Sequence, residues 1–222
     1  MSQPSVSRMV EDYVTLIWKA YEWPDSTPTT TDLAESLGVT PSTVSANLKK
    51  LARDGLISYK PYGPISLTDE GRRIAVDIVR RHRIIETYLV ERLGLTWDQV
   101  HDEADRMEHA VSDLVLDRMD DALGNPTADP HGDPIPARDG TVQDIDSLLL
   151  ADAPAGAEVV VLRVSDRHPE ILRYLTEKGV TIGHAMRVER RADRAGLLHV
   201  RLDEDLLELT TASARDIRVR IR

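Results

Sequence analysis

A short stretch near the middle of the chain, HDEADRMEH at residues 101–109, contains two histidines and four carboxylates in nine positions, with only Arg106 to offset them. On an α-helix, side chains spaced by four, seven and eight residues lie on one face. The residues with this spacing are His101, Asp105, Glu108 and His109. Because clustered carboxylates repel one another unless solvent or a cation screens them, this face is either a solvated acidic surface or a cation site.

A second group of potential ligands precedes this stretch. In the segment HRIIE, His82 and Glu86 lie one helical turn apart. For a single pair at this spacing, an exposed ion pair is the simpler explanation, but two such groups on neighbouring helices favour a metal site. The chain has no cysteine, so oxygen and nitrogen atoms must hold any ion, and thiolate chemistry and disulfides are excluded.

The composition is that of a folded protein of one to three domains, with 222 residues, 41% of them hydrophobic, and a net charge of −10. The negative charge argues against a protein that coats nucleic acid without specificity. The acid is unevenly distributed, because residues 98–121 carry nine Asp or Glu against two Arg, whereas residues 1–73 are nearly neutral. Neither a signal peptide nor an apolar run of bilayer length is evident, so we expect a cytoplasmic protein with no membrane partner.

The first third of the sequence predicts three helices followed by a hairpin. Apolar residues at helical spacing predict a first helix over residues 10–23. A second helix begins with Thr30 or Thr31 as its cap and stops at a glycine. A third helix, rich in Ser, Thr and Lys, begins with Thr40 as its cap. Two short strands around a Pro/Gly turn follow, and they would form a wing.

A polar helix that follows a tight turn is suited to the major groove of DNA, where its N-terminal residues reach base edges. The candidates on the third helix are Thr40, Ser42, Thr43, Ser45, Asn47 and Lys49. The candidates for phosphate contacts on the wing are Lys60 and Tyr62. The alternative is a helical subdomain whose polar face is simply hydrated. The order of helix, glycine turn, polar helix and wing favours a DNA-binding domain.

The rest of the sequence predicts two long helices and then a small β domain. The helices cover about residues 69–93 and 96–123, and Gly and Pro residues make 124–140 a loop. Beyond the loop, short β-rich segments predict an antiparallel barrel of roughly 70 residues, with one helix at about 169–178. The predicted fold class is therefore an α+β multidomain protein, with a winged helix-turn-helix, an all-helical domain and a small β-barrel.

Four segments together carry a family resemblance: MVEDY, TPSTVSANLKKLARDGLI, HRIIETYL and GLTWDQVHDEADRMEH. Over nearly its whole length the chain resembles the metal-dependent transcription regulators of the diphtheria toxin repressor family. The resemblance implies a homodimer that binds a palindromic double-stranded DNA operator. The implied parts are a winged-helix domain at residues 1–73, a metal-binding and dimerisation domain at 74–140, a linker at 141–154 and an SH3-like (iron-transport-A-like) domain at 155–222.

The resemblance also implies two metal sites. The effector site would consist of Asp12, Asp105, Glu108 and His109. The ancillary site would consist of His82, Glu86 and His101, completed by ligands from the SH3-like domain. In that domain the segment SDRHPE lies where such ligands are expected, and it offers first His168 and then Glu170.

The ligand types indicate which ion the effector site prefers. The iron-responsive branch of the family has a methionine and a cysteine where this chain has Asp12 and Asp105. Carboxylates suit Mn²⁺, whereas sulfur favours metals later in the series, so the chain resembles the manganese transport regulators. That branch often has a further Glu where this chain has Thr15, so a water or a backbone carbonyl would complete the shell. Fe²⁺ or another divalent transition metal is the alternative cofactor.

The function implied by the resemblance is repression of manganese homeostasis genes, by a protein that is not an enzyme and has no small-molecule substrate. An ion that needs ligands from the first helix and from the acidic helices favours the arrangement in which they meet, and so sets the spacing of the two recognition helices. Three rivals stay open: an iron(II)-dependent regulator of the same fold, a metal-independent winged-helix regulator, and a metallohydrolase that activates water. For the hydrolase, the sequence offers neither a nucleophile motif nor a phosphate loop.

Overall fold

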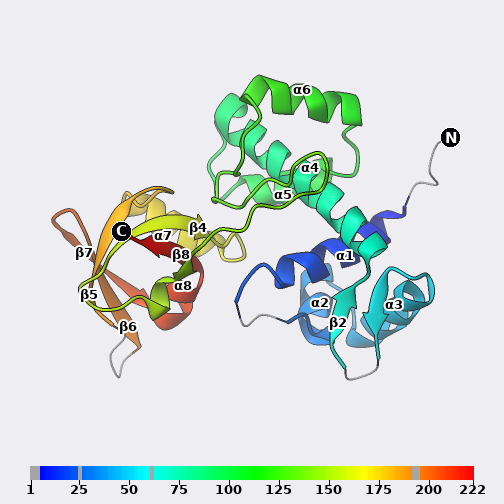
Figure 1. The fold of residues 1–222 in the computed structure, drawn as a ribbon, viewed down its shortest axis with the longest axis horizontal. Coiled ribbons are helices and arrows are strands. Elements are labelled where there is room, and N and C mark those ends of the chain that lie inside the picture. The colour runs from blue at the N-terminus through cyan, green and yellow to red at the C-terminus, as the bar shows by residue number, and fades with distance from the viewer. Residues whose placement is uncertain (1–5, 25–26, 61–62, 192–195) are drawn as a thin grey trace. The chain divides into compact units, whose positions relative to one another are not determined.

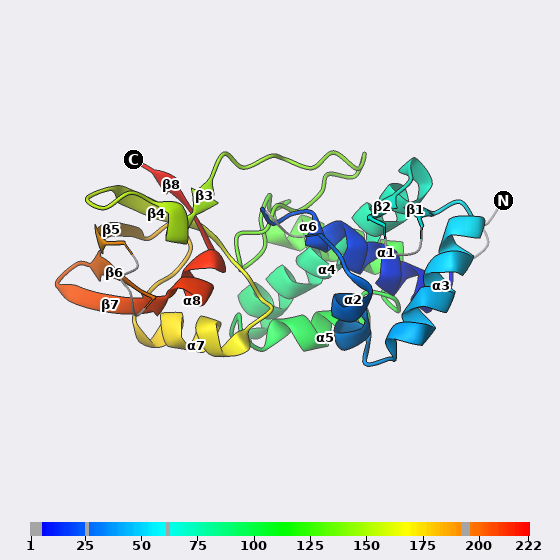
Figure 2. The same ribbon diagram turned by 90° about the horizontal axis from the view of Figure 1, so that it is seen from below.

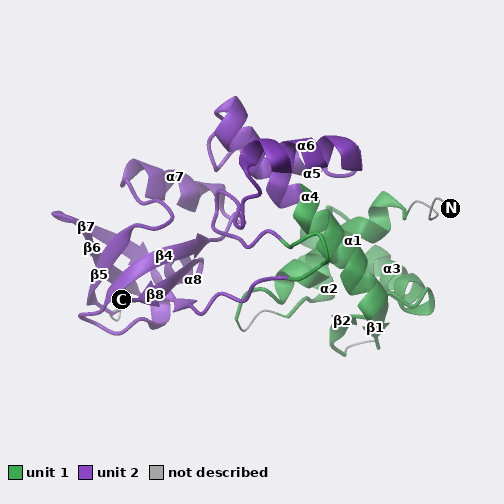
Figure 3. Ribbon diagram, turned by 45° about the horizontal axis from the view of Figure 1, so that its top comes forward, with its two compact units in different colours: residues 1–81, 136–141 green, residues 82–135, 142–222 purple. Residues whose placement is uncertain are grey.

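The computed structural model of the chain is divided into two compact units. It describes residues 6–24, 27–60, 63–191 and 196–222. Figure 3 shows the first unit, residues 1–81 with 136–141, in green and the second, residues 82–135 with 142–222, in purple. The long helix α4 (Asp69–Leu93) begins in the first unit and ends in the second. None of the described helices combines the length and the apolar character needed to span a lipid bilayer.

The first unit begins with three helices, α1 (Arg8–Ala20), α2 (Thr30–Leu37) and α3 (Pro41–Arg53). The cap of α2 is Thr29, so the prediction of Thr30 or Thr31 is wrong. The Thr29 side chain accepts a hydrogen bond from the backbone N–H of Asp32 at 3.1 Å, and the Asp32 carboxylate accepts one from the backbone N–H of Thr29 at 3.1 Å. This reciprocal pair requires an acid three residues after the cap, and only Thr29 meets that requirement.

The third helix and the wing follow the prediction (Figure 1). Thr40 caps α3 by accepting a hydrogen bond from the backbone N–H of Thr43 at 3.2 Å. Strands β1 (Ile57–Tyr59) and β2 (Ile65–Leu67) pair as an antiparallel hairpin. The winged helix-turn-helix is thus confirmed. Its core includes Val10, Tyr13, Ile17, Leu33, Val44, Leu48, Leu51, Ile57 and Ile65.

The second unit contains a helical part, made of the end of α4 with α5 (Val100–Met107) and α6 (Asp113–Leu123). The prediction of one helix over residues 96–123 is wrong. The chain turns after α5, and Ser112 starts a new helix by accepting a hydrogen bond from the backbone N–H of Val115 at 3.4 Å. The buried apolar side chains between these helices are Ile84, Ile85, Leu89, Val100, Ala104, Leu116 and Ile135.

The predicted loop after α6 is irregular, and its middle part, residues 129–136, is mostly buried; we call residues 129–133 the buried loop. Asp129 Oδ1 accepts hydrogen bonds from the backbone N–H groups of His131 at 2.8 Å and Asp133 at 2.9 Å, which close a tight turn. Gly132 has a φ of +83°, and a Cβ on it would lie 1.9 Å from the carbonyl oxygen of Leu162. Only glycine allows the loop to approach the strand that contains Leu162 this closely.

The remainder of the second unit is a six-stranded antiparallel sheet with its own apolar core (Figure 2). The strand order is β3-β8-β4-β5-β6-β7. The strands are β3 (Leu148–Leu149), β4 (Glu158–Val164), β5 (Ala185–Arg190), β6 (Leu197–Leu202), β7 (Asp205–Thr210) and β8 (Ile217–Ile221). The helical elements are η1 (Leu150–Asp152), α7 (Pro169–Glu177) and α8 (Thr211–Arg215). The sequence predicted the five longer strands and α7, whereas β3, η1 and α8 are too short to leave a periodic pattern.

Candidate metal centre

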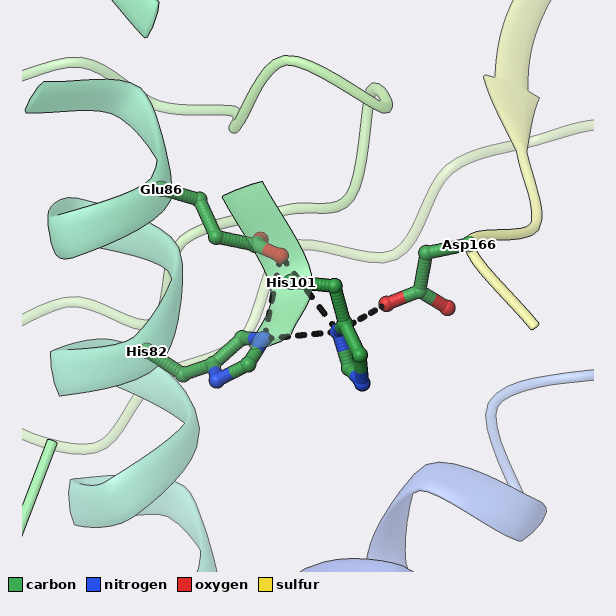
Figure 4. Close-up of side chains that lie close together, drawn as sticks. All are labelled: His82, Glu86, His101 and Asp166. Carbon is green, nitrogen blue, oxygen red and sulfur yellow. Dashed lines mark hydrogen bonds and ion pairs between the residues drawn. The ribbon is translucent and has the colours of Figure 1, made fainter. Parts of the chain in front are cut away.

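Four side chains of the second unit converge on one point (Figure 4). His82 and Glu86 project from α4, His101 from α5, and Asp166 from the segment after β4. Each offers one ligand atom, and the four atoms lie within 4.8 Å of one another. His82 Nε2 lies 3.1 Å from Glu86 Oε1 and 3.2 Å from His101 Nδ1. His101 Nδ1 lies 3.0 Å from Asp166 Oδ2, so these residues form what we call the four-residue cluster.

Burial and charge suit this cluster to a cation. His82 and Glu86 are both buried. Burial opposes the ionisation of Glu86, but the surrounding histidines, led by His82, hold the pKa of its carboxyl group well below the usual range. Glu86 Oε1 is buried and lies at ion-pair distance from two imidazoles, 3.1 Å from His82 Nε2 and 3.5 Å from His101 Nδ1. A bound cation between these atoms would be attracted by the carboxylate and held by the ring nitrogens.

Three of the four residues predicted for the effector site also lie in the second unit, at and just after the end of α5. His82 Nδ1 lies 2.7 Å from Glu108 Oε2 and 3.3 Å from Asp105 Oδ1. His109 Nε2 lies 3.3 Å from Glu108 Oε1. The Asp105 side chain is 50% exposed, whereas Glu108 is buried. Asp12 lies on α1 in the first unit, so its place in this site stays a prediction.

The segment SDRHPE contributes Asp166 to the four-residue cluster, and not the two residues selected from the sequence. His168 Nδ1 lies 3.6 Å from Glu170 Oε1, and their side chains are 53% and 68% exposed. Neither belongs to a group of potential ligands among the residues that the structure describes. The structure thus brings one residue of this segment to the cluster, and nothing in the sequence fixed the register of the segment against the helices. The signal that could have found Asp166 is an acid two residues after the end of a buried strand.

A second group of buried ionisable side chains lies behind Glu86, and the sequence analysis missed it. His131 Nδ1 lies 3.7 Å from Glu86 Oε2. Burial would lower the pKa of His131, but the carboxylates of Glu86 and Asp129 raise it to about 10. Burial, together with the nearby carboxylates of Asp133 and Glu86, raises the pKa of Asp129 well above its usual range.

The residues predicted to read DNA lie on α3 and the wing, with different exposures. Thr40, Ser42, Thr43, Lys49 and Lys60 are exposed. Ser45 and Asn47 are half-buried, and the Asn47 amide donates a hydrogen bond to the hydroxyl of Tyr13 at 3.0 Å. Asn47 therefore also braces α3 against α1. Tyr62 lies outside the described residues.

Three family descriptions match successive parts of the chain. Residues 5–65 match the iron dependent repressor N-terminal DNA binding domain, residues 68–137 the iron dependent repressor metal binding and dimerisation domain, and residues 148–221 the FeoA domain. The iron-dependent repressor IdeR of Mycobacterium tuberculosis is 34% identical over 175 residues, which are 73% of this chain and 76% of that protein. The diphtheria toxin repressor of Corynebacterium efficiens is 32% identical over 186 residues, which are 79% of this chain and 81% of that protein.

Solved structures match over nearly the whole chain. A manganese-dependent transcriptional repressor in complex with manganese is 42% identical with a TM-score of 0.91, covering 96% of this chain and 100% of the other. The manganese regulator SloR is 30% identical with a TM-score of 0.82, covering 96% of this chain and 98% of the other. The family parts occur here in their expected order, and the sequence identity extends across all of them. The chain therefore belongs to the family of metal-dependent repressors that includes IdeR and the diphtheria toxin repressor.

Proposed function

We propose that this chain is a manganese-dependent transcriptional repressor that binds a palindromic operator as a homodimer and controls manganese homeostasis genes. The observation that carries the proposal is the convergence of His82, Glu86, His101 and Asp166, with only nitrogen and oxygen ligands, in a chain that also has a winged helix. Such ligands suit a divalent ion such as Mn²⁺. The solved repressor with 42% identity is itself a complex with manganese. The proposed domains are residues 1–73, 74–140, 155–222 and the linker 141–154.

The four-residue cluster is proposed as the ancillary site, with Asp166 as the ligand from the β domain. The effector site is proposed to consist of Asp12, Asp105, Glu108 and His109. A bound ion supplies a double positive charge that offsets the repulsion between these carboxylates. Because Asp12 belongs to the first unit and the others to the second, an ion that binds all four favours one arrangement of the two units.

The second candidate ion is Fe²⁺, because the relative of 34% identity is named an iron-dependent repressor. Against this candidate stand Asp12 and Asp105, which supply hard oxygen ligands where the iron-responsive branch has sulfur. Thr15 of α1 is buried, and among the described residues its hydroxyl has no hydrogen-bond partner. We propose that a water or a backbone carbonyl, and not a further carboxylate, completes the shell at the effector site.

The proposed dimer surface lies on the helical part of the second unit. Three apolar side chains there are exposed, Leu93 at 60%, Leu114 at 68% and Val115 at 45%. A second copy of the chain would cover them, in agreement with the dimerisation domain that residues 68–137 match. We expect Leu114→Asp to shift the protein from dimer to monomer in sedimentation velocity, with Asp102→Ala as the exposed control. A dimer that persists at micromolar concentration would contradict this surface.

The proposed function is tested by operator binding at controlled metal content. An operator is first selected from random DNA with the full-length protein and Mn²⁺, and its binding is then followed by fluorescence anisotropy. We expect tight binding with Mn²⁺, weaker binding with Fe²⁺ under anaerobic conditions, and loss of binding with a chelator. Equal binding in chelator would establish the metal-independent rival, and stronger binding with Fe²⁺ would establish the iron regulator. The absence of catalysis and the cytoplasmic location are part of the same proposal.

A further inference from the structure

The two oxygens of the Glu86 carboxylate face different surroundings. Oε1 faces His82 and His101 in the four-residue cluster, at 3.1 Å and 3.5 Å. Oε2 faces away from the cluster, toward Nδ1 of His131 at 3.7 Å. Because a carboxylate is planar, whatever holds Oε2 also sets the direction in which Oε1 points. His131 is therefore placed to orient a metal ligand without entering the metal site itself.

The imidazole of His131 is fixed by a second contact. Its Nε2 lies 2.7 Å from the carbonyl oxygen of Trp97, and a carbonyl can only accept, so Nε2 is the donor. The imidazole also stacks on the indole of Trp97, with ring centroids 6.1 Å apart and planes at 11°. The indole N–H in turn donates to the hydroxyl of Thr176 on α7 at 2.7 Å. The ring is thus held at a defined angle when its Nδ1 edge meets Glu86.

The buried loop that carries His131 is held between helix α4 and strand β4. Arg83 of α4 donates hydrogen bonds to the carbonyl oxygen of Pro134 at 2.7 Å and to Asp133 Oδ2 at 3.1 Å. Arg163 of β4 donates to the other oxygen of Asp133 at 2.5 Å. The backbone N–H of Val164, also on β4, donates to the carbonyl oxygen of His131 at 2.9 Å. A displacement of β4 would therefore move the buried loop, and His131 with it.

We propose that His131 is a positioning residue for the ligand Glu86, and that the buried loop transmits the position of the β domain to the metal-binding helix. This inference rests on the proposed function, since it assumes that Glu86 binds an ion. Partners that orient a metal ligand typically change metal affinity by about 10- to 100-fold when they are removed. The β domain would then act on the ancillary site in two ways, directly through Asp166 and indirectly through His131.

The same residues suggest a rival explanation, because Glu86, Asp129 and His131 also bring ligand atoms within 4.8 Å of one another. Two contacts oppose a third ion there. Asp129 Oδ1 already accepts two backbone hydrogen bonds, and Arg83 Nε lies 3.7 Å from Asp129 Oδ2. A fixed guanidinium beside the carboxylate disfavours a further cation at that point. The positioning role is therefore the one that the geometry favours.

The test is a titration of the full-length protein with Mn²⁺, in which the electron paramagnetic resonance signal of the free ion gives the number and affinity of bound ions. The variants are His131→Ala and His131→Gln, and the matched control is His184→Ala, on the β domain outside the cluster. We expect His131→Ala to weaken the binding of one class of ions, those at the four-residue cluster, by about 10- to 100-fold. The affinity of the other class and the number of bound ions should be unchanged. His131→Gln keeps an N–H donor for the carbonyl oxygen of Trp97 but lacks a second ring nitrogen facing Glu86 Oε2, so we expect a smaller loss than in His131→Ala.

Chemical unfolding of the metal-free variants separates positioning from a purely structural role. An affinity loss in one ion class, with the metal-free stability of His131→Gln close to that of the wild type, supports the inference. Unchanged affinity would overturn it, as would equal weakening of both classes together with reduced metal-free stability. Loss of an ion that Asp166→Ala retains would establish the third cation site instead. Operator binding that is unchanged by a chelator would contradict the proposed function. The Mn²⁺ affinities of the His131 variants would still decide the role of His131.

Discussion

The two proposed metal sites differ in where their ligands come from and in how far they are shielded from water. The four-residue cluster lies within the second unit, and its central residues His82 and Glu86 are buried. The proposed effector ligands come from both units, and Asp105 among them is half-exposed. Ligands held by one packed unit are already oriented before an ion binds, whereas ligands from two units must be brought together. On the proposed assignment, the cluster would stabilise the second unit and the effector site would operate the switch.

The largest effect is expected from Asp105→Ala, which removes an effector ligand and keeps all four residues of the four-residue cluster. Loss of a residue that only orients a metal ligand reduces metal affinity by up to about 100-fold. Because Asp105 is proposed as a direct ligand, the Mn²⁺ concentration for half-maximal operator binding should rise by more than this. Fluorescence anisotropy measures it, and Asp102→Ala, an exposed acid on the same helix, is the control. An unchanged metal response would show that Asp105 is not an effector ligand. The proposed difference in exposure between the two sites would then lose its support.

A second prediction concerns the stability that the cluster gains from metal. At a free Mn²⁺ concentration 100 times the dissociation constant, the free energy of unfolding should rise by about 2.7 kcal/mol per site. In Asp105→Ala this gain should persist for the cluster alone, and hydrogen exchange should show it as added protection in α4 and α5. If Asp105→Ala gained no stability from Mn²⁺, the four-residue cluster would not bind an ion independently of the effector site. The contrast drawn between the two sites would then be wrong.

A third prediction sharpens the assignment of the ligand from the β domain. Asp166→Ala should weaken the binding of the ancillary ion by about tenfold, because Asp166 lies on a loop and the other three ligands of the four-residue cluster remain. His168→Ala should leave that affinity within error, since the His168 side chain is 53% exposed and pairs with Glu170. Calorimetric titration with Mn²⁺ compares the two variants. The reverse result would restore His168 as the ligand and place Asp166 outside the site.

The smallest effect is expected at Asp216, whose backbone carbonyl accepts a hydrogen bond from Ser165, beside Asp166. Burial, followed in smaller part by Glu170, raises the pKa of the Asp216 carboxyl group. A raised pKa means that the folded state holds its proton more tightly, so stability should fall as pH rises through that pKa. Asp216→Asn should lack this slope above the usual pKa of an aspartate and should gain less than about 1 kcal/mol of stability, because the group is half-exposed. Unfolding of both proteins by denaturant across this pH range measures the slope, and parallel curves would contradict the expectation.

The elements that could be predicted from the sequence are those with local signals. Helix α3 has its cap and a proline in its first turn, and α4 shows the helical period across 25 residues, so their bounds needed no tertiary information. The pair His82 and Glu86 could be found for the same reason, since one helical turn brings them together. These features depend on contacts within a few residues along the chain.

The features that could not be predicted depend on contacts between distant segments. Asp166 becomes a neighbour of His101 only because β4 delivers it there, 65 residues farther along the chain. The break after α5 depends on a serine whose capping role competes with an otherwise helical sequence. His131 looked like one polar residue in a loop of prolines and glycines, and its burial follows from the close approach that Gly132 permits.

The ring of His82 lies between the two proposed sites, with Nε2 toward Glu86 and Nδ1 toward Glu108. A neutral imidazole has one nitrogen with a free lone pair and one that carries hydrogen. An ion held by Nε2 would therefore fix the tautomer and make Nδ1 a donor to Glu108, 2.7 Å away. Binding of an ion at the ancillary site would in this way orient the carboxylate of Glu108, which is a proposed effector ligand. The order in which the two ions bind would therefore affect the switch.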